Sequence, residues 1–259
     1  MSNSFKYFVY DIETVVDKKL LNQVCYAGKN LSDEEAYKAE IEELSKNDGR
    51  TFVNPSFHTP VVLAAVAVKE DYSIAKVGVL GLPEKTTEKI VKDFWDLYAE
   101  KRPVLVDFYG KSFDMRVLEL WSYKLGITLP GRHFGKFGPS YRHSDEFHLE
   151  LHEFLTNYGA IRFKGGLNLF AKILGKPGKM ETHGDMVQDL FEQKKFFEIE
   201  DYCLCDAMDT YFVFLRTRVM TGELKPDREI YLWSEAKKLM EIKNKEDGHF
   251  GEYLKNLQE

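Results

Sequence analysis

Two acidic side chains close the first apolar segment of the chain, in Asp11-Ile12-Glu13. The segment from Lys6 to Ile12 is short, aromatic and β-branched, which predicts a strand. Alternation along a strand places Asp11 and Glu13 on the same face, where two carboxylates repel each other unless cations hold them. Carboxylate oxygens are hard ligands that suit Mg²⁺ or Mn²⁺. The pair alone does not establish a metal site, because a surface edge or a strand end can have the same sequence.

A third carboxylate, Asp114, follows an apolar strand that is predicted over Val104 to Phe108. Gly110 permits a tight turn after this strand, and Ser112 is expected to cap a helix over Phe113 to Leu125. Asp114 then lies in the first helical turn. An acidic charge is favourable there even without a catalytic role.

Tyr202 and Asp206 lie on a helix that is predicted over Glu198 to Met220. Being four residues apart, they project from one side of the helix, so a phenol and a carboxylate are presented together. Such a pair could hold a water molecule and a metal ion. Alternatively, Tyr202 packs on the core and Asp206 is solvated. Asp209 follows Tyr202 by seven residues, so spacing alone does not exclude it as the relevant carboxylate.

The rest of the chain predicts the elements that must hold these residues. A continuously apolar segment over residues 61–69 predicts a buried strand, and a weaker strand is expected over residues 73–80. Residues 17–58 interrupt the pattern and include a helix from Ser32 to about Lys46, with acidic residues in its first turn. Further helices are expected over residues 87–101, 147–158, 167–174, 185–193 and 228–243, and loops over 126–140 and 175–184.

These elements predict an α/β fold, with a mixed sheet of about five strands flanked by helices and a helical insertion after the first strand. The length of 259 residues suits one large domain or two small ones. No linker or repeat divides the chain. We expect residues 1–225 to form the domain, with the insertion at about 17–58, and residues 226–259 to form a C-terminal helical extension of it.

Composition excludes several classes of protein. The 36 basic and 42 acidic side chains give a net charge of −6, which argues against coating nucleic acid through bulk charge. Three cysteines do not make a disulfide framework or a four-ligand zinc site. No apolar run reaches the roughly 18–20 residues that span a bilayer, and the first residues do not resemble a secretion signal. We therefore expect a soluble, cytoplasmic protein with no membrane partner.

Basic side chains gather in two stretches without Asp or Glu, residues 120–144 and 159–180. Such stretches on an acidic protein are typical either of one positive face that follows a phosphate backbone or of an ordinary solvated surface. Charge alone does not decide between these interpretations.

In combination, the motifs resemble the DEDD superfamily of 3′–5′ exonucleases. That superfamily has an RNase H-like fold, Asp-x-Glu on the first strand, Asp at a helix start and a late helical Tyr-x-x-x-Asp or His-x-x-x-x-Asp. Tyr202 and Asp206 supply the tyrosine form, and no His in the sequence is followed five positions later by Asp. The chain therefore resembles the tyrosine (DEDDy) branch. Roughly residues 6–224 resemble the subgroup similar to the proofreading exonuclease domain of family B DNA polymerases, through residues 9–14, 57–58, 112–114, 158–160, 174–180, 201–206, 210–211 and 215–216.

The resemblance implies a mechanism. Asp11, Glu13, Asp114 and Asp206 would coordinate two divalent cations, Mg²⁺ or Mn²⁺, roughly 3.5–4 Å apart. Tyr202 would orient the attacking water; an unperturbed phenol has a pKa near 10, which does not suit a free base. The expected reaction removes nucleoside 5′-monophosphates from the 3′ end of DNA.

Five further residues are expected to contact the substrate: Thr14, Tyr109, Lys111, Phe113 and Lys164. The rings would stack on bases and the lysines would contact phosphates, although core packing and ordinary surface exposure are competing interpretations. The family usually has Asn where Tyr109 stands, next to the terminal nucleotide. This departure bears on substrate handling and leaves the metal site intact. His148 is interpreted as structural.

Alternative functions are an RNase D-like exoribonuclease and an inactive nucleic-acid-binding module. The latter would be expected to lack an acidic ligand, and none is missing. The expected partner is DNA with a free 3′ end, single-stranded or 3′-tailed, and self-association into a homodimer is open. No polymerase follows in the chain, so repair, recombination and phage defence, including a CBASS-type accessory role, are the pathways that the resemblance leaves open.

Overall fold

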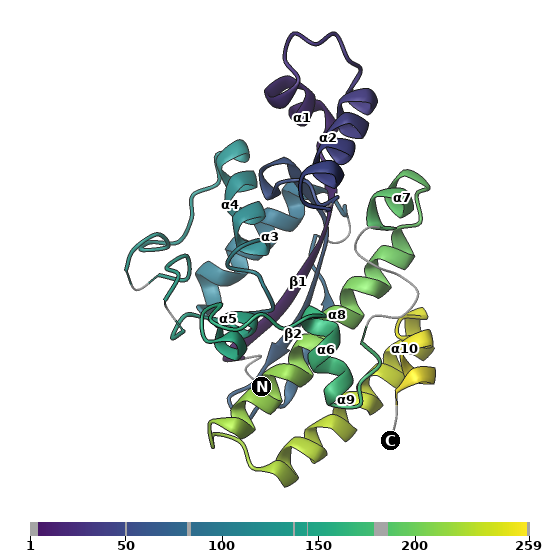
Figure 1. Ribbon diagram of the computed structural model, residues 1–259. Coiled ribbons are helices and arrows are strands. Elements are labelled where there is room, and N and C mark those ends of the chain that lie inside the picture. The colour runs from purple at the N-terminus through teal and green to yellow at the C-terminus, as the bar shows by residue number, and fades with distance from the viewer. Residues whose placement is uncertain are drawn as a thin grey trace.

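The fold is built on a five-stranded sheet in the order β3-β2-β1-β4-β5. A computed structural model describes residues 5–49, 51–81, 84–136, 138–143, 145–178 and 186–257. The strands are β1 (Tyr7–Val16), β2 (His58–Val68), β3 (Ile74–Val79), β4 (Val104–Asp107) and β5 (His148–Glu150). β1, β2 and β3 are antiparallel neighbours, whereas β4 and β5 run parallel to β1. This mixed sheet with helices on both faces confirms the predicted α/β fold and is consistent with an RNase H-like fold (Figure 1).

The pairing of β1 differs on its two sides. β2 pairs with it from Tyr7 to Val16, whereas β4 pairs with it only from Tyr7 to Val9. The second half of β1 therefore has no paired strand on the β4 side among the described residues. This unpaired half carries Asp11 and Glu13.

Helices cover both faces of the sheet (Figure 1). Alternating residues of β1 divide the core accordingly, with Phe8 and Tyr10 packed toward α3 and α4, and Tyr7 and Val9 packed toward α8. α8 is buried along most of its length and contacts four of the five strands. The helices are α1 (Lys18–Cys25), α2 (Asp33–Asp48), η1 (Pro55–Phe57), α3 (Thr87–Lys101), α4 (Asp114–Leu125), α5 (Leu151–Thr156), α6 (Gly166–Ile173), α7 (Val187–Glu192), α8 (Phe196–Met220), α9 (Pro226–Asp247) and α10 (Gly251–Asn256).

The insertion after the first strand is helical, as predicted. α1 and α2 form a hairpin that projects beyond the end of the sheet (Figure 1). A capping box begins α2: the Ser32 hydroxyl accepts from the Glu35 amide, and the Glu35 carboxylate accepts from the Ser32 amide. Lys18 ties the hairpin to α7 through ion pairs with Glu34 at 2.6 Å and Glu192 at 2.7 Å.

Several local predictions are wrong. Residues 148–150 form β5 instead of the start of a helix, because their backbone pairs with β4. Ser112 does not cap α4; its hydroxyl donates to the Tyr109 carbonyl at 2.9 Å, and Phe113 occupies the cap position without a side-chain bond. The helix α10 was not expected. Residues 179–184 of the predicted loop and Asp185, where a helix was expected to begin, lie outside the described residues.

Within the described ranges, no helix is both long and apolar enough to cross a membrane.

Candidate active site

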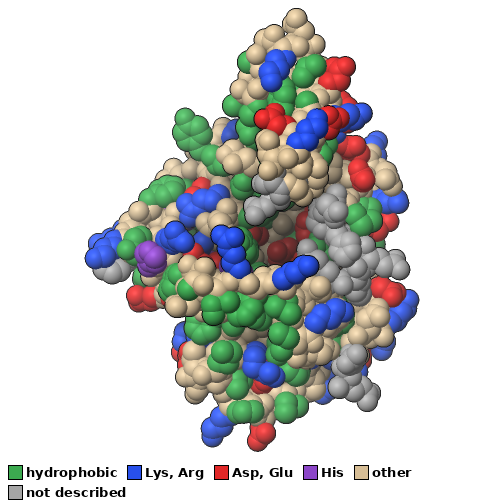
Figure 2. All heavy atoms as spheres, in the orientation of Figure 1, with side chains coloured by type: hydrophobic (Ala, Val, Ile, Leu, Met, Phe, Trp, Pro, Cys, Tyr) green, Lys and Arg blue, Asp and Glu red, His purple; other side chains and the backbone are tan. Residues whose placement is uncertain are grey.

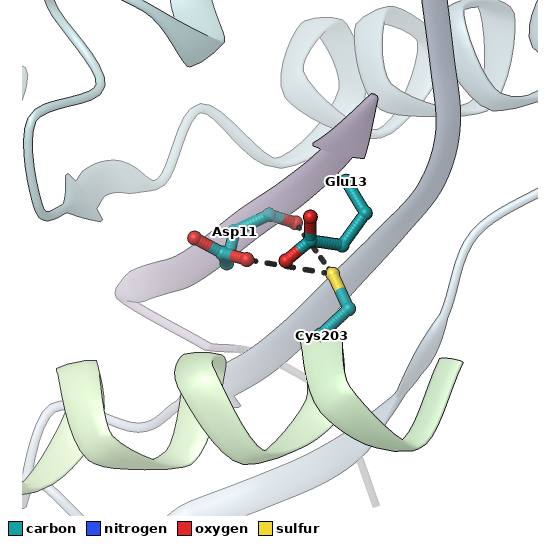
Figure 3. Close-up of side chains that lie close together, drawn as sticks. All are labelled: Asp11, Glu13 and Cys203. Atoms are coloured by element: carbon teal, nitrogen blue, oxygen red, sulfur yellow. Dashed lines mark hydrogen bonds between the residues drawn. The ribbon is translucent and has the colours of Figure 1, made fainter. Parts of the chain in front are cut away.

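The acidic end of β1 faces α8. Asp11 and Glu13 lie on the side of the strand that meets Cys203, and ligand atoms of the three residues lie within 4.8 Å of one another (Figure 3). The Cys203 thiol donates to the Asp11 carbonyl at 3.4 Å and to its carboxylate Oδ2 at 3.5 Å. Because Cys203 is fully buried and does not line the adjoining cleft, it supports Asp11 from behind.

Asp114 reaches the same place from the other side of β1. It is the first residue of α4, and its Oδ1 accepts from the Ile12 amide at 3.1 Å. That amide is available because β4 ends before it could pair there. Because β4 ends early, the first carboxylate of α4 can accept from the backbone of Ile12, the residue between Asp11 and Glu13.

α8 supplies the remaining pair. Tyr202 and Asp206 both line the cleft, one helical turn apart. Asp209 faces elsewhere: it is 1 % exposed and accepts from the Tyr253 hydroxyl of α10 at 2.5 Å. The structure therefore distinguishes the two carboxylates that sequence spacing left open, with Asp206 at the cleft and Asp209 in the core.

These side chains lie together in a cleft of about 1030 Å³. Figure 2 shows a hollow with acidic side chains in its depth and basic side chains around its rim. The opposite wall comes from the insertion, where Tyr37 and Ile41 of α2 line the cleft together with Phe52. Lys38 is the one Lys or Arg among the described residues that line this cleft.

The carboxylates strongly affect one another's ionisation. Burial raises the pKa of Asp11 well above its usual range, and the charges of Glu13, Asp114 and Asp206 raise it further. Burial and then the charge of Asp107 raise the pKa of Asp114. Burial, followed by the charge of Asp206, raises the pKa of Tyr202, so its phenol remains protonated. The site therefore brings several oxygen ligands together where burial and their mutual repulsion disfavour the ionised form.

Comparison with known families agrees with this arrangement. Residues 50–257 match a family described as predicted 3′–5′ exonucleases related to the exonuclease domain of PolB. The chain belongs to this family. The match contains Asp114, Tyr202 and Asp206, but it begins after Asp11, Glu13 and the α1–α2 hairpin. No curated protein in the comparison matches the chain.

Three of the expected substrate-binding residues line the cleft of this exonuclease: Thr14, Tyr109 and Phe113. Phe113 packs in an aromatic cluster with Phe52 and His58, at centroid distances of 5.4 and 5.3 Å. Their positions suit contact with nucleotides, whereas the positions of the two lysines do not.

Lys111 is buried, and its ammonium is already held. It donates to the Arg142 carbonyl at 2.9 Å and lies 3.5 Å from both Asp145 and Glu153. Lys164 is exposed, but it does not line the cleft. The geometry therefore argues against phosphate contact by Lys111 and leaves Lys164 outside the site.

Tyr109 adopts an unusual backbone conformation. Its φ of +78° lies in the left-handed region, which Asn tolerates better than Tyr. Its amide donates to the Glu150 carboxylate at 2.7 Å, and its ring lies 4.2 Å from that of His152. These contacts hold the tyrosine at the mouth of the cleft.

A buried polar cluster beside the site was missed by the sequence analysis. His148 Nε2 lies 2.6 Å from Asp107 Oδ2, and its Nδ1 lies 3.0 Å from the Pro139 carbonyl, which confirms a structural role for His148. Asp107 also accepts from the Gly110 amide at 3.2 Å, and a Cβ at Gly110 would overlap its carboxylate. The cluster thus fixes the turn that leads to Asp114. Its available signal was an Asp at the end of an apolar strand.

Proposed function

We propose that this chain is a metal-dependent 3′–5′ exodeoxyribonuclease of the tyrosine branch. One observation carries the proposal: carboxylates from β1, α4 and α8 converge on one cleft together with the phenol of Tyr202. Membership of the exonuclease family supports the reaction class. The tyrosine branch, the metal ions and the preference for DNA go beyond that membership.

The donor set fits divalent cations. Asp11, Glu13, Asp114 and Asp206 offer the hard oxygen ligands that Mg²⁺ and Mn²⁺ prefer. Burial, followed by the charges of nearby carboxylates, raises the pKa values of Asp11 and Asp114, and bound cations would offset both effects. Bound cations would supply charge neutralisation at the phosphate and a lowered pKa for a coordinated water. These four residues are the proposed ligands of the cations.

Tyr202 has an orienting role in this proposal. Burial and nearby carboxylates raise its pKa, so the phenol keeps its proton at neutral pH and does not act as a base. Its hydroxyl is suited to hydrogen-bonding the water that attacks the terminal phosphodiester. The rings of Tyr109, Phe113 and Phe52 offer surfaces on which the bases of a single strand can stack.

The function is tested with purified protein, Mg²⁺ or Mn²⁺, and 5′-labelled single-stranded and 3′-tailed oligonucleotides. We expect a ladder of shortened DNA products, no cleavage in EDTA, and resistance of an oligonucleotide whose 3′ end is blocked. A matched RNA oligonucleotide should be degraded more slowly.

Other outcomes would identify other functions. Preferential degradation of RNA would favour an RNase D-like exoribonuclease, and cutting of closed circular DNA would indicate an endonuclease. Binding without cleavage in either metal would indicate the inactive module. Undiminished cleavage by metal-stripped protein in EDTA would contradict the four-carboxylate site.

Tyr202→Phe should lower the single-turnover rate by roughly 10–10³-fold, the range between an ordinary and a catalytic hydrogen bond. The substitution keeps the ring and its packing and removes only the hydroxyl. Metal affinity, measured by titration of thermal stability, should be unchanged. Tyr211→Phe is the matched control, because this buried tyrosine of the same helix donates to the Tyr72 carbonyl away from the cleft. An equal loss in both variants would reduce Tyr202 to a packing residue.

A further inference from the structure

One wall of the cleft comes from a helix that the family match does not contain. α2 belongs to the hairpin that follows β1, and the match begins after it, at residue 50. Tyr37, Lys38 and Ile41 of this helix line the cleft. The hairpin therefore contributes to the site of this chain in a way that membership of the family does not explain.

The cleft has an excess of negative charge. Six carboxylates line it among the described residues, namely the four proposed metal ligands together with Glu34 and Glu42 of α2. Bound cations would offset the charge of the metal ligands, but they would leave the two glutamates of α2 facing the substrate. A DNA strand carries a negative charge on each phosphate, so contact with this wall favours a compensating cation. Lys38 is the one Lys or Arg in the described lining that can supply it.

The two glutamates of α2 have other basic partners. Glu34 accepts from Lys18 at 2.6 Å, and Glu42 lies 3.4 Å from Lys46. The ammonium of Lys38 lies 3.8 Å from Glu34, and within the described part of the chain it makes no hydrogen bond. Its side chain is 69 % exposed. An exposed ion pair of this length contributes little, so Lys38 can turn toward a ligand at small cost.

The helix that carries Lys38 is anchored. Lys18 joins α2 to α7 through Glu34 and Glu192, and its side chain is only 17 % exposed. Its ammonium also lies 4.7 Å from the centre of the Tyr37 ring, directly before Lys38 in the sequence. Lys18 thus has a structural role, whereas Lys38 is a free-ended cation on a fixed wall of the cleft.

We propose that α2 is a substrate-binding wall and that Lys38 binds a backbone phosphate of the DNA strand in the cleft. A backbone contact adds affinity without a preference for sequence. Lys38 is not among the proposed metal ligands, so it should strengthen binding and leave the chemical step unchanged. This inference rests on the proposed exonuclease function and names a substrate contact that the function leaves open.

Binding measured without cleavage tests the contact. In an Asp206→Asn background at constant Mg²⁺, fluorescence anisotropy records the affinity for one single-stranded DNA over a range of salt concentrations. Lys38→Gln should weaken binding roughly tenfold at about 50 mM salt. Loss of one phosphate contact lowers the salt slope of a single strand by about 0.7, so this effect should shrink to roughly twofold at about 500 mM salt. Lys38→Arg keeps the charge and should retain the slope.

A neutral phosphate analogue locates the contact on the strand. Methylphosphonate replaces one phosphate at a time and so removes one negative charge at each position. At the contacted position the replacement should weaken binding to the Asp206→Asn parent roughly tenfold. The same replacement should change binding to the Lys38→Gln variant by less than about twofold, because the contact is already lost.

Kinetics separate binding from chemistry. In the chain with all four carboxylates intact, Lys38→Gln should raise the DNA concentration that gives half the maximal single-turnover rate. The rate at saturating DNA should change by less than about twofold, as expected for loss of a contact made equally before and during the reaction. A lower saturating rate with unchanged affinity would overturn the inference, since Lys38 would then act on the chemical step.

Lys46→Gln is the matched control. This lysine lies two turns further along α2 beside its own glutamate, and it does not line the cleft. The substitution should leave the affinity and the salt slope unchanged. A slope that Lys38→Gln leaves unchanged, or that Lys46→Gln lowers equally, would overturn the inference while the exonuclease function stands. Failure of the wild-type chain to degrade any oligonucleotide would instead refute the function.

Discussion

Asp206→Asn should lower the rate of 3′ nucleotide removal by about 10³-fold or more, corresponding to about 4 kcal/mol in the barrier. The substitution keeps the size of the side chain and removes the charge of a proposed metal ligand in the cleft. Asp209→Asn, one turn further along α8, should change the rate by less than about threefold. Asp209 packs against Tyr253 in the core, so it has no route to the substrate.

The pKa of Asp209 explains why its substitution should also be mild for folding. Burial raises this pKa to about 8, so the carboxyl is largely protonated at pH 7 and Asn resembles it closely. Single-turnover kinetics and thermal unfolding of both variants make the comparison. A dead Asp209→Asn together with an active Asp206→Asn would require α8 to present the other face to the cleft.

Asp11→Asn should abolish activity and yet stabilise the metal-free protein. At pH 7 ionised Asp11 is disfavoured by burial and then by the charges of its neighbouring carboxylates, and keeping it protonated also costs free energy, so the amide removes a cost in either form. The melting temperature in EDTA should rise by about 2–4 °C for each kcal/mol of repulsion removed. Added Mn²⁺ should raise the melting temperature of the wild-type protein, and this increase should be lost in the variant.

The direction of the pH dependence is fixed by the raised pKa of Asp11. The native state binds its proton more tightly than the unfolded state, so metal-free stability is greatest below the unfolded pKa and falls as pH rises toward the folded pKa. The stabilisation by Asp11→Asn should therefore be larger at pH 7 than at pH 4. Asp96→Asn, at an exposed position of α3, is the control and should show neither effect. A variant less stable than wild type in EDTA at pH 7 would contradict mutual repulsion at the site.

Strong periodic signals allowed much of the fold to be predicted. The helix expected over residues 87–101 coincides with α3, and the Ser32 capping signal marks the start of α2. The three-residue strand β5 could not be predicted in this way. Its residues belong to a sequence with helical periodicity, and they become a strand only because β4 lies beside them.

The candidate site shows the same division. The carboxylates and Tyr202 were proposed from residue type and order, and the structure brings them to one cleft. Lys111 was expected at a phosphate because of its charge, but its environment comes from residues more than thirty positions away. The hydrogen bond that joins Thr14 to His58 in the cleft likewise depends on the register between β1 and β2, which no local pattern specifies.

The short pairing between β1 and β4 has a wider consequence. An unpaired strand edge normally attracts another strand, because its amides and carbonyls need partners. Here Asp114 takes one of those amides, and the cleft occupies the space that a longer β4 would fill. A longer β4 would therefore add hydrogen bonds to the sheet and at the same time fill the cleft. The chain turns at Tyr109, which has a positive φ, and at Gly110, where a side chain would overlap Asp107. This turn ends β4 and leaves the cleft open.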